Sequence, residues 1–200
     1  MNVTGIFPTP LAHQLLTLDT QPFVDYAVEL EQLQPQGVLE GGWQSEQLDL
    51  KTSSPIAELV EQVQLRVNEL VEHLWQLNCR ATLTQGWINS NQGSAQLANN
   101  WSHMHPGNFI SLVYYAQVSK HSGDLIIEPP HAWNDYAVPE SYMQEVNPWN
   151  AQRHHYTPTQ GELIAFPSWI KHAAQPNHTN ERRISYAFNA QLLESFVSNK

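Results

Sequence analysis

The 200-residue sequence is short of cysteine and of basic residues. Cys79 is the single cysteine, which excludes an intramolecular disulfide and a zinc site built from several thiolates. Lys and Arg number 9 against 19 Asp and Glu, and the formal net charge is −10. Because nucleic acids and anionic lipids require positive charge opposite their phosphates, nonspecific binding to either is not expected.

Long apolar runs are also lacking. The first residues, MNVTGIFPTPLAHQLL, have neither the positive flank nor the apolar core of a signal peptide, and no run is long enough to span a membrane. We therefore expect a soluble, cytoplasmic protein. The chain is 41% hydrophobic and contains 7 Trp, 7 Tyr and 6 Phe, which indicates a packed core. Its length predicts one domain over residues 1–200.

The N-terminal part, about 1–79, is expected to be mainly helical. Residues 5–10, GIFPTP, are read as a short strand, and residues 22–34 have the apolar spacing of an amphipathic helix. A longer helix is predicted to begin with Ser54 as its cap and Pro55 in its first turn. Its apolar stripe runs from Ile56 to Leu74, about five turns, and predicts packing against a sheet.

After Cys79 the pattern changes to short β-branched or aromatic runs separated by Gly, Pro or Asn. They are ATLTQGWINS, FISLVYYAQV, GDLIIEPP, HHYTP, GELIAFP and RRISYAFNAQL. Two helices followed by about eight strands predict a mostly β protein. The expected fold is a double-stranded β-helix, a cupin-like jelly roll, over about 80–192, with the N-terminal helices packed on one sheet.

Three histidines are candidate metal ligands. His103 and His105 are two residues apart, so on a strand their side chains project to the same face. That pair is weak evidence by itself in a chain with 10 histidines. His172 follows 67 residues after His105, at the start of a strand that a jelly roll can bring beside the first.

Arg183 and Ser185 form an R-x-S pair on an otherwise apolar strand. An inward-facing arginine is costly unless an anion meets it, and a planar guanidinium suits a carboxylate. Arg182 faces the opposite side of the strand. The alternative interpretation is that one of the two arginines pairs on the surface with Glu181 or Asp124.

These blocks together resemble the 2-oxoglutarate/Fe(II)-dependent dioxygenase superfamily. HMHPGNFISLVYY, SGDLIIEPP, GELIAFPSWIKHAAQPN and ERRISYAFN resemble a branch of 2-oxoglutarate/Fe(II) oxygenases from bacteria and tailed phages. The resemblance covers residues 85–191 and implies an oxidoreductase. It would use Fe(II), O2 and the small-molecule co-substrate 2-oxoglutarate to hydroxylate a prime substrate, with release of succinate and carbon dioxide.

By this resemblance His103, His105 and His172 are the iron ligands, and Arg183 with Ser185 binds the distal carboxylate of 2-oxoglutarate. The superfamily's usual triad is two histidines and one carboxylate. His105 therefore stands where Asp or Glu is expected, and Asp124 or Glu128 is the alternative source of a carboxylate ligand.

Two other functions stay open at this point. The spacing from Gly161 through Pro167 to His172 also resembles the second cupin motif, which would mean a metal-dependent enzyme without 2-oxoglutarate. A non-catalytic jelly-roll binding module is the third possibility. The Pro-rich segment 129–152 is expected to help select the substrate. Four tryptophans are either entrance residues or packing: Trp101, Trp133, Trp149 and Trp169.

Overall fold

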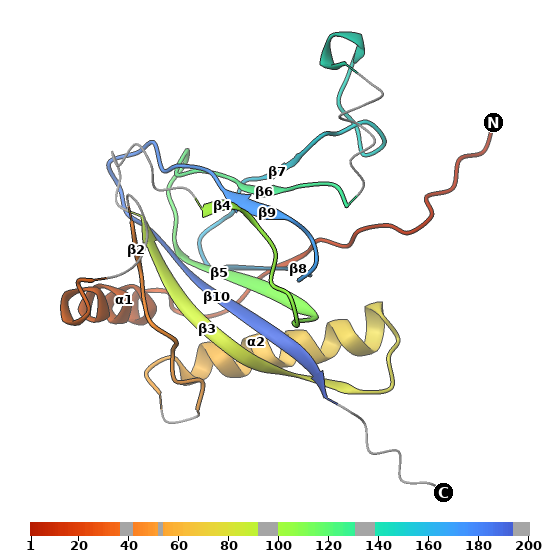
Figure 1. Ribbon diagram of the computed structural model, residues 1–200. Helices are drawn as coiled ribbons and strands as arrows, with labels where there is room; N and C mark the ends of the chain where they lie inside the picture. The colour runs from red at the N-terminus through yellow and green to blue at the C-terminus, as the bar shows by residue number, and fades with distance from the viewer. Residues whose placement is uncertain (37–41, 52–53, 92–99, 131–138, 194–200) are drawn as a thin grey trace, which may run out of the picture.

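The computed structural model describes residues 1–36, 42–51, 54–91, 100–130 and 139–193 (Figure 1). The N-terminal elements in chain order are β1 (Ala12–Leu15), α1 (Gln21–Leu33), β2 (Trp43–Gln44), α2 (Ala57–Glu69) and the π-helical turn η1 (Leu70–Leu74). The remaining elements are β3 (Arg80–Asn91), β4 (Asn100–His103), β5 (Ile110–Gln117), β6 (Leu125–Ile127), the 3-10 turn η2 (Glu140–Tyr142), β7 (His154–Tyr156), β8 (Glu162–Pro167), β9 (His172–Ala174) and β10 (Arg183–Leu193).

The strands form two antiparallel sheets. The larger has the order β1-β8-β5-β10-β3-β2, and the smaller has the order β4-β9-β6-β7. From β3 onward the chain moves repeatedly between them, so that β3, β5, β8 and β10 lie in one sheet and β4, β6, β7 and β9 in the other. This is the predicted double-stranded β-helix. Strands β1 and β2 extend the larger sheet at its two edges.

Both helices pack on the outer face of the larger sheet (Figure 1). Helix α1 buries Phe23 and Ala27, four residues apart, and α2 buries Leu59, Val63 and Val67 at the same spacing. These side chains form one core with the sheet residues Ile88, Leu112, Tyr114, Ile184, Tyr186 and Phe188. The predicted packing of the helices on one sheet is confirmed.

The start and end of the second helix differ from the prediction. Ser54 does not cap α2, which begins at Ala57 and has no side-chain cap. The Ser54 hydroxyl instead accepts a hydrogen bond from the Ile56 N–H at 3.3 Å, within the preceding turn. The apolar stripe does continue to Leu74, but its last turn is the π-helical η1.

The strand predicted at residues 5–10 is wrong. Those residues are irregular, and the first strand is β1, which pairs with β8 along the edge of the larger sheet. Pro8 and Pro10 lack the N–H that a sheet ladder requires, so pairing begins only after them.

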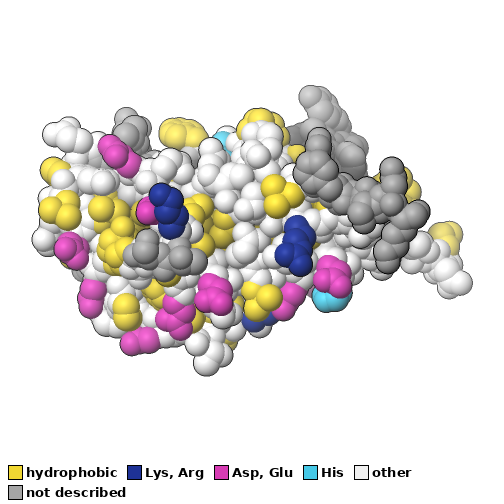
Figure 2. Space-filling view, turned by 90° about the horizontal axis from the view of Figure 1, so that it is seen from below, with side chains coloured by type: hydrophobic (Ala, Val, Ile, Leu, Met, Phe, Trp, Pro, Cys, Tyr) yellow, Lys and Arg dark blue, Asp and Glu magenta, His cyan; other side chains and the backbone are white. Residues whose placement is uncertain are grey.

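Acidic side chains are exposed on the helical side of the molecule. Seen from below in Figure 2, Asp and Glu side chains are scattered over this face, and on its described part Lys and Arg do not gather into a patch. Within the described ranges the structure has no helix of the length and apolarity that crossing a bilayer requires.

Candidate metal centre

A pocket of about 420 Å³ opens between the two sheets. Residues that alternate along the central strands line its floor, because every second side chain of a strand faces the same side. From β10 these are Arg183, Ser185 and Ala187, and from β3 they are Trp87, Asn89 and Asn91. The smaller sheet contributes His103 and His172 to the opposite wall.

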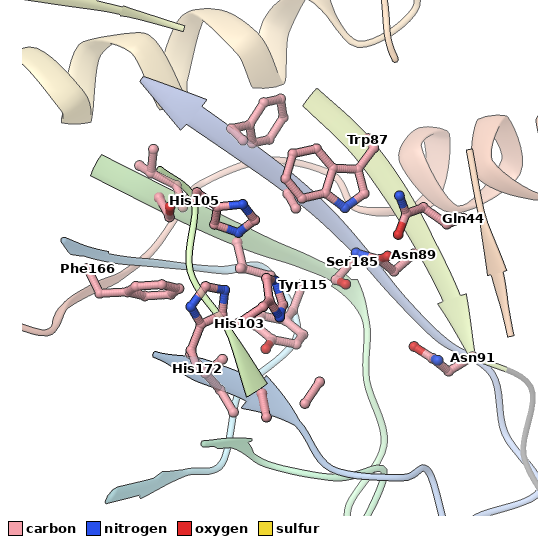
Figure 3. Close-up of a pocket in the computed structure, with 18 of the residues that line it drawn as sticks. Gln44, Trp87, Asn89, Asn91, His103, His105, Tyr115, Phe166, His172 and Ser185 are labelled. Carbon is pink, nitrogen blue, oxygen red and sulfur yellow. The ribbon is translucent and has the colours of Figure 1, made fainter. Parts of the chain in front are cut away.

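His103, His105 and His172 meet in this pocket (Figure 3). His103 ends β4 and lies directly opposite His172, the first residue of β9, in the antiparallel register. Their ring centroids are 4.4 Å apart, and the His105 ring lies 4.9 Å from His103 and 5.0 Å from His172. One potential ligand atom from each residue lies within 4.8 Å of the other two, so a single ion between them is within reach of all three.

His105 reaches the cluster from outside the strand, whereas the H-x-H spacing placed both histidines on it. Strand β4 ends at His103. The chain is held beside the turn after β8 because the His105 N–H donates to the Ser168 carbonyl at 3.0 Å. The His105 ring also packs against Trp87, with centroids 5.5 Å apart.

The hydrogen bonds of two of the rings leave one nitrogen of each free for a metal. Nδ1 of His103 lies 2.6 Å from the Trp101 carbonyl oxygen, and Nδ1 of His172 lies 3.0 Å from that of Ile170. A carbonyl oxygen only accepts, so Nδ1 carries the proton and Nε2 keeps its lone pair. Backbone partners of this kind orient histidine ligands in metal sites.

Burial keeps two of the three imidazoles, those of His105 and His172, uncharged at neutral pH. The pKa of His172 is lowered to about 3, chiefly by desolvation and to a smaller extent by the neighbouring His103 and His105, while its hydrogen bond to the Ile170 carbonyl opposes the shift. Desolvation, followed by the proximity of His103, lowers the pKa of His105 to about 4. Neutral imidazole is the form that binds a metal ion.

Neither alternative carboxylate joins the histidine cluster. Asp124 accepts a hydrogen bond from the Thr157 hydroxyl at 2.8 Å, and its other oxygen lies 3.7 Å from Nδ1 of His155. Glu128 lines a separate groove with Met104 and Lys171. Among the described residues, the donor set at this position consists of three nitrogens.

Arg183 lies in the same pocket and is only 3% exposed. Its guanidinium donates to neutral acceptors: the backbone carbonyls of Ser122, Gly123 and Gln175 and the side-chain oxygen of Asn91. No described carboxylate forms an ion pair with it, and burial lowers its pKa. The pocket therefore contains a buried cation that has no carboxylate partner among the described residues.

Gly123 is required for this placement of the guanidinium. A Cβ there would lie 2.6 Å from Nη1 of Arg183 and 2.5 Å from the Gln175 carbonyl oxygen. Its φ of +99° is also a conformation that favours glycine.

Arg182 faces away from the pocket, as the alternation along the strand predicts. It forms an ion pair with Glu31 of α1, with a nitrogen–oxygen distance of 2.5 Å. Of the two arginines, Arg182 is thus the one that pairs outside the pocket, and its partner is Glu31 rather than Glu181 or Asp124.

A row of polar side chains crosses the pocket floor beside Arg183, and most of it escaped the sequence analysis. Register places Gln44 opposite Asn89, Asn89 opposite Ser185, and Ser185 opposite Tyr115. All four side chains line the pocket. The alternating Asn residues in WINSN were an available signal, whereas Tyr115 lies in the apolar run FISLVYYAQV, where nothing in the sequence marks it as a pocket residue. Burial raises the pKa of Tyr115 to about 12, and the Arg183 charge opposes that rise.

The tryptophans considered for the entrance have different positions. Trp101 lines the pocket and is 73% exposed. Trp169 lines the separate groove, and Trp149 is exposed on the surface. Trp133 lies outside the described residues.

Solved structures with a similar fold are 2-oxoglutarate/Fe(II) oxygenases. A prolyl-4-hydroxylase from Pseudomonas putida has a TM-score of 0.57 at 16% identity, covering 90% of this chain and 92% of that one. A prolyl hydroxylase from Trichoplax adhaerens, in complex with a hypoxia inducible factor peptide fragment, has a TM-score of 0.55 at 14% identity, covering 90% and 83%. The epimerase SnoN, in complex with Fe3+, alpha ketoglutarate and nogalamycin RO, has a TM-score of 0.58 at 16% identity, covering 90% and 78%.

At these identities the structures establish the fold alone. No curated protein matches the sequence. The 2OG-Fe(II) oxygenase family model, by contrast, matches residues 85–189, more than half of the chain and the part that carries the three histidines, Arg183 and Ser185. The chain belongs to the 2OG-Fe(II) oxygenase family, whose members are oxidoreductases that use Fe(II), 2-oxoglutarate and O2.

Proposed function

We propose that this oxygenase binds Fe(II) through His103, His105 and His172. Arg183 and Ser185 then hold the distal carboxylate of 2-oxoglutarate. The observation that carries this proposal is one pocket that contains three imidazoles within reach of a single ion, together with a buried guanidinium that forms no ion pair with a described carboxylate.

The donor set fits ferrous iron. Imidazole nitrogen suits iron among other first-row metals, and three protein ligands leave positions on a six-coordinate ion for the co-substrate. Three neutral ligands leave the full 2+ charge of the ion in place, which favours a doubly charged anion beside it. When bound, ferrous iron supplies the activation of O2, coupled to conversion of 2-oxoglutarate to succinate and carbon dioxide.

The protein's own groups hold the co-substrate. Arg183 is buried and fixed by its bonds to backbone carbonyls, so its position does not depend on the ligand. The hydroxyls of Ser185 and Tyr115 lie in the same row of the sheet and form no hydrogen bond with described residues. Both are available to a carboxylate, which can only accept hydrogen bonds.

Apolar side chains line the pocket beside the histidines. Phe166 of the larger sheet packs on the His172 ring with centroids 4.6 Å apart, and Leu125 of the smaller sheet also lines the pocket. Trp87 covers His105 from the larger sheet. Apolar packing of this kind limits the access of water to an oxidising centre.

Metal analysis and anaerobic spectroscopy test the proposal. We expect the purified protein to show a visible charge-transfer band that requires both Fe(II) and 2-oxoglutarate, and to release succinate when O2 is admitted. Metal binding without a response to 2-oxoglutarate would contradict the co-substrate assignment.

The ligand assignment is tested by His172→Ala, which we expect to lose iron. His73→Ala, which changes an exposed histidine on η1, is the matched control and should keep full iron occupancy. Full occupancy in His172→Ala as well would show that the triad is wrong.

A further inference from the structure

The Arg183 guanidinium is held by neutral acceptors on two of its nitrogens. Nη1 donates to the backbone carbonyls of Ser122, Gly123 and Gln175 at 2.8, 3.3 and 3.0 Å. Nη2 donates to the side-chain oxygen of Asn91 at 3.2 Å. A guanidinium has five N–H groups, and the Nε–H forms no hydrogen bond with the described residues. The Nε–H and the second hydrogen of Nη2 are therefore left for a ligand.

Asn91 supplies the one side chain among these acceptors. It ends β3 and lies directly opposite Arg183 in the antiparallel register. It is 3% exposed, and it lines the same pocket (Figure 3). Its backbone carbonyl accepts a hydrogen bond from Nδ2 of Asn177 at 3.2 Å, and a Cβ at Gly42 would lie 2.8 Å from the Asn91 amide nitrogen. Close packing therefore fixes the Asn91 amide against the guanidinium.

The chemical type of residue 91 decides whether the charge of Arg183 is available to a ligand. Aspartate has nearly the same shape as asparagine and can accept the same hydrogen bond. Its carboxylate would also form an ion pair with the guanidinium, and opposite charges attract strongly where water is excluded. The carboxylate of a ligand would then compete with an anion that the protein already holds. An amide orients the guanidinium without this competition.

A purely structural role for Arg183 would not require the amide. A buried arginine without an anionic partner is costly, and an aspartate at position 91 would lower that cost. The described contacts of the guanidinium are nevertheless all with neutral oxygens. This arrangement suits an arginine whose anion is a ligand.

We propose that Asn91 is a positioning residue for the co-substrate. Its amide oxygen orients Arg183 and leaves the charge of the guanidinium to the distal carboxylate of 2-oxoglutarate. The inference rests on the proposed function, because that function assigns Arg183 to this carboxylate. Asn91 acts through Arg183, so its effect should depend on whether the ligand has a distal carboxylate.

Anaerobic titration of the Fe(II)-loaded full chain with two 2-oxo acids tests the proposal. 2-Oxopentanoate has the same chain length and the same oxo-acid end as 2-oxoglutarate, but a methyl group replaces the distal carboxylate. The quantity measured is the ratio of the two dissociation constants, taken from the visible charge-transfer band. The wild type should bind 2-oxoglutarate about 100-fold more tightly, because 2-oxopentanoate lacks the charge-assisted hydrogen bonds to Arg183.

Asn91→Asp should lower this ratio by about 30-fold or more, because the new carboxylate competes for Arg183. Binding of 2-oxopentanoate should stay within about threefold of the wild type, since this acid has no group for the guanidinium. Asn91→Ala removes the hydrogen bond without adding charge and should lower the ratio by about threefold to tenfold. Asn78→Asp adds the same charge at an exposed position and is the matched control, with the wild-type ratio.

The order of the two Asn91 variants separates positioning from packing. If Asn91 only packed against Arg183, the isosteric aspartate would keep the wild-type ratio and alanine would be the more damaging change. Either that order or an unchanged ratio in Asn91→Ala would overturn the inference. Urea unfolding shows whether each variant is folded, and the alanine result alone decides if the aspartate variant is not.

The wild type separates this failure from failure of the proposed function. If it forms no charge-transfer band, or binds both acids equally well, the metal or co-substrate assignment is wrong and the inference falls with it. If the wild type prefers 2-oxoglutarate strongly and both Asn91 variants keep that preference, the inference about Asn91 alone is wrong.

Discussion

The two faces of β10 differ in their surroundings: one packs in the main core and the other lines the pocket. Toward the helices it presents Ile184, Tyr186 and Phe188, each fully buried in the main core. Toward the smaller sheet it presents Arg183, Ser185 and Ala187, which line the pocket. Adjacent residues on one strand therefore belong to two environments, and strand alternation alone separates them.

The comparison teaches where stability and function lie in this fold. The helix face is closed by apolar packing, and Tyr186 adds a hydrogen bond to the Phe23 carbonyl at 2.6 Å. The pocket face keeps a cation, hydroxyls and an unpaired amide oxygen, which would destabilise a closed core. Substitutions at neighbouring positions should thus separate binding from stability.

Arg183→Met should have the largest effect on the pocket face. It removes the guanidinium while keeping a long side chain, so the KM for 2-oxoglutarate should rise about 100-fold or more, because charge-assisted hydrogen bonds to the co-substrate are lost. Iron titration should be unchanged. Arg80→Met, at an exposed position of β3, is the control. If 2-oxoglutarate binds Arg183→Met as tightly as it binds the wild type, Arg183 does not hold the distal carboxylate of the co-substrate.

Ile184→Ala, one residue along, should act on the opposite face. Ile184 has no exposed surface, and truncating such a side chain typically costs about 2–5 kcal/mol. Urea unfolding should show this loss, while the KM for 2-oxoglutarate at a temperature where the variant is folded stays within about twofold. If Ile184→Ala instead changes the KM for 2-oxoglutarate strongly and loses little stability, the helix-facing side of β10 contributes to binding rather than to stability.

Lowering the pH should destabilise the metal-free protein through His172. Its folded pKa of about 3 lies below the ordinary 6.5, so between pH 6 and pH 4 the unfolded chain binds a proton that the folded chain does not. Stability should therefore fall as pH falls, by about 1.4 kcal/mol per pH unit for this one group. Urea unfolding of wild type and His172→Gln at both pH values measures this change in the free energy of unfolding. If the free energy of unfolding falls equally with pH in both proteins, the expected burial of a neutral imidazole is disproved.

Ser185→Ala should have the smallest effect. Loss of one hydroxyl hydrogen bond to the co-substrate corresponds to about 1 kcal/mol, or roughly a fivefold rise in the KM for 2-oxoglutarate. The free energy of unfolding should change by less than about 0.5 kcal/mol. Ser141→Ala, at an exposed serine, controls for the substitution itself. A loss of stability without a KM change would assign Ser185 to packing.

The sequence predicted the elements that depend on local spacing. The stripe from Ile56 to Leu74 and the alternating runs after Cys79 correspond to helices and strands in the structure. Strand parity also separated Arg182, which faces Glu31, from Arg183, which faces the pocket. Three local details were wrong: the strand at residues 5–10, the Ser54 cap and the placement of His105 on a strand. Neighbouring prolines and a preceding turn changed the hydrogen bonding at the first two, and β4 ends at His103, before His105.

By itself, the sequence determined the secondary-structure pattern and the chemical types available to the site, since both follow from residues close together in the chain. Only the tertiary structure decided that His103 lies opposite His172, that Gln44 joins Asn89 beside Ser185, and that Tyr115 faces the pocket. Those contacts depend on the register between strands far apart in sequence. A shift of one residue in that register would turn every such side chain to the other face of the sheet.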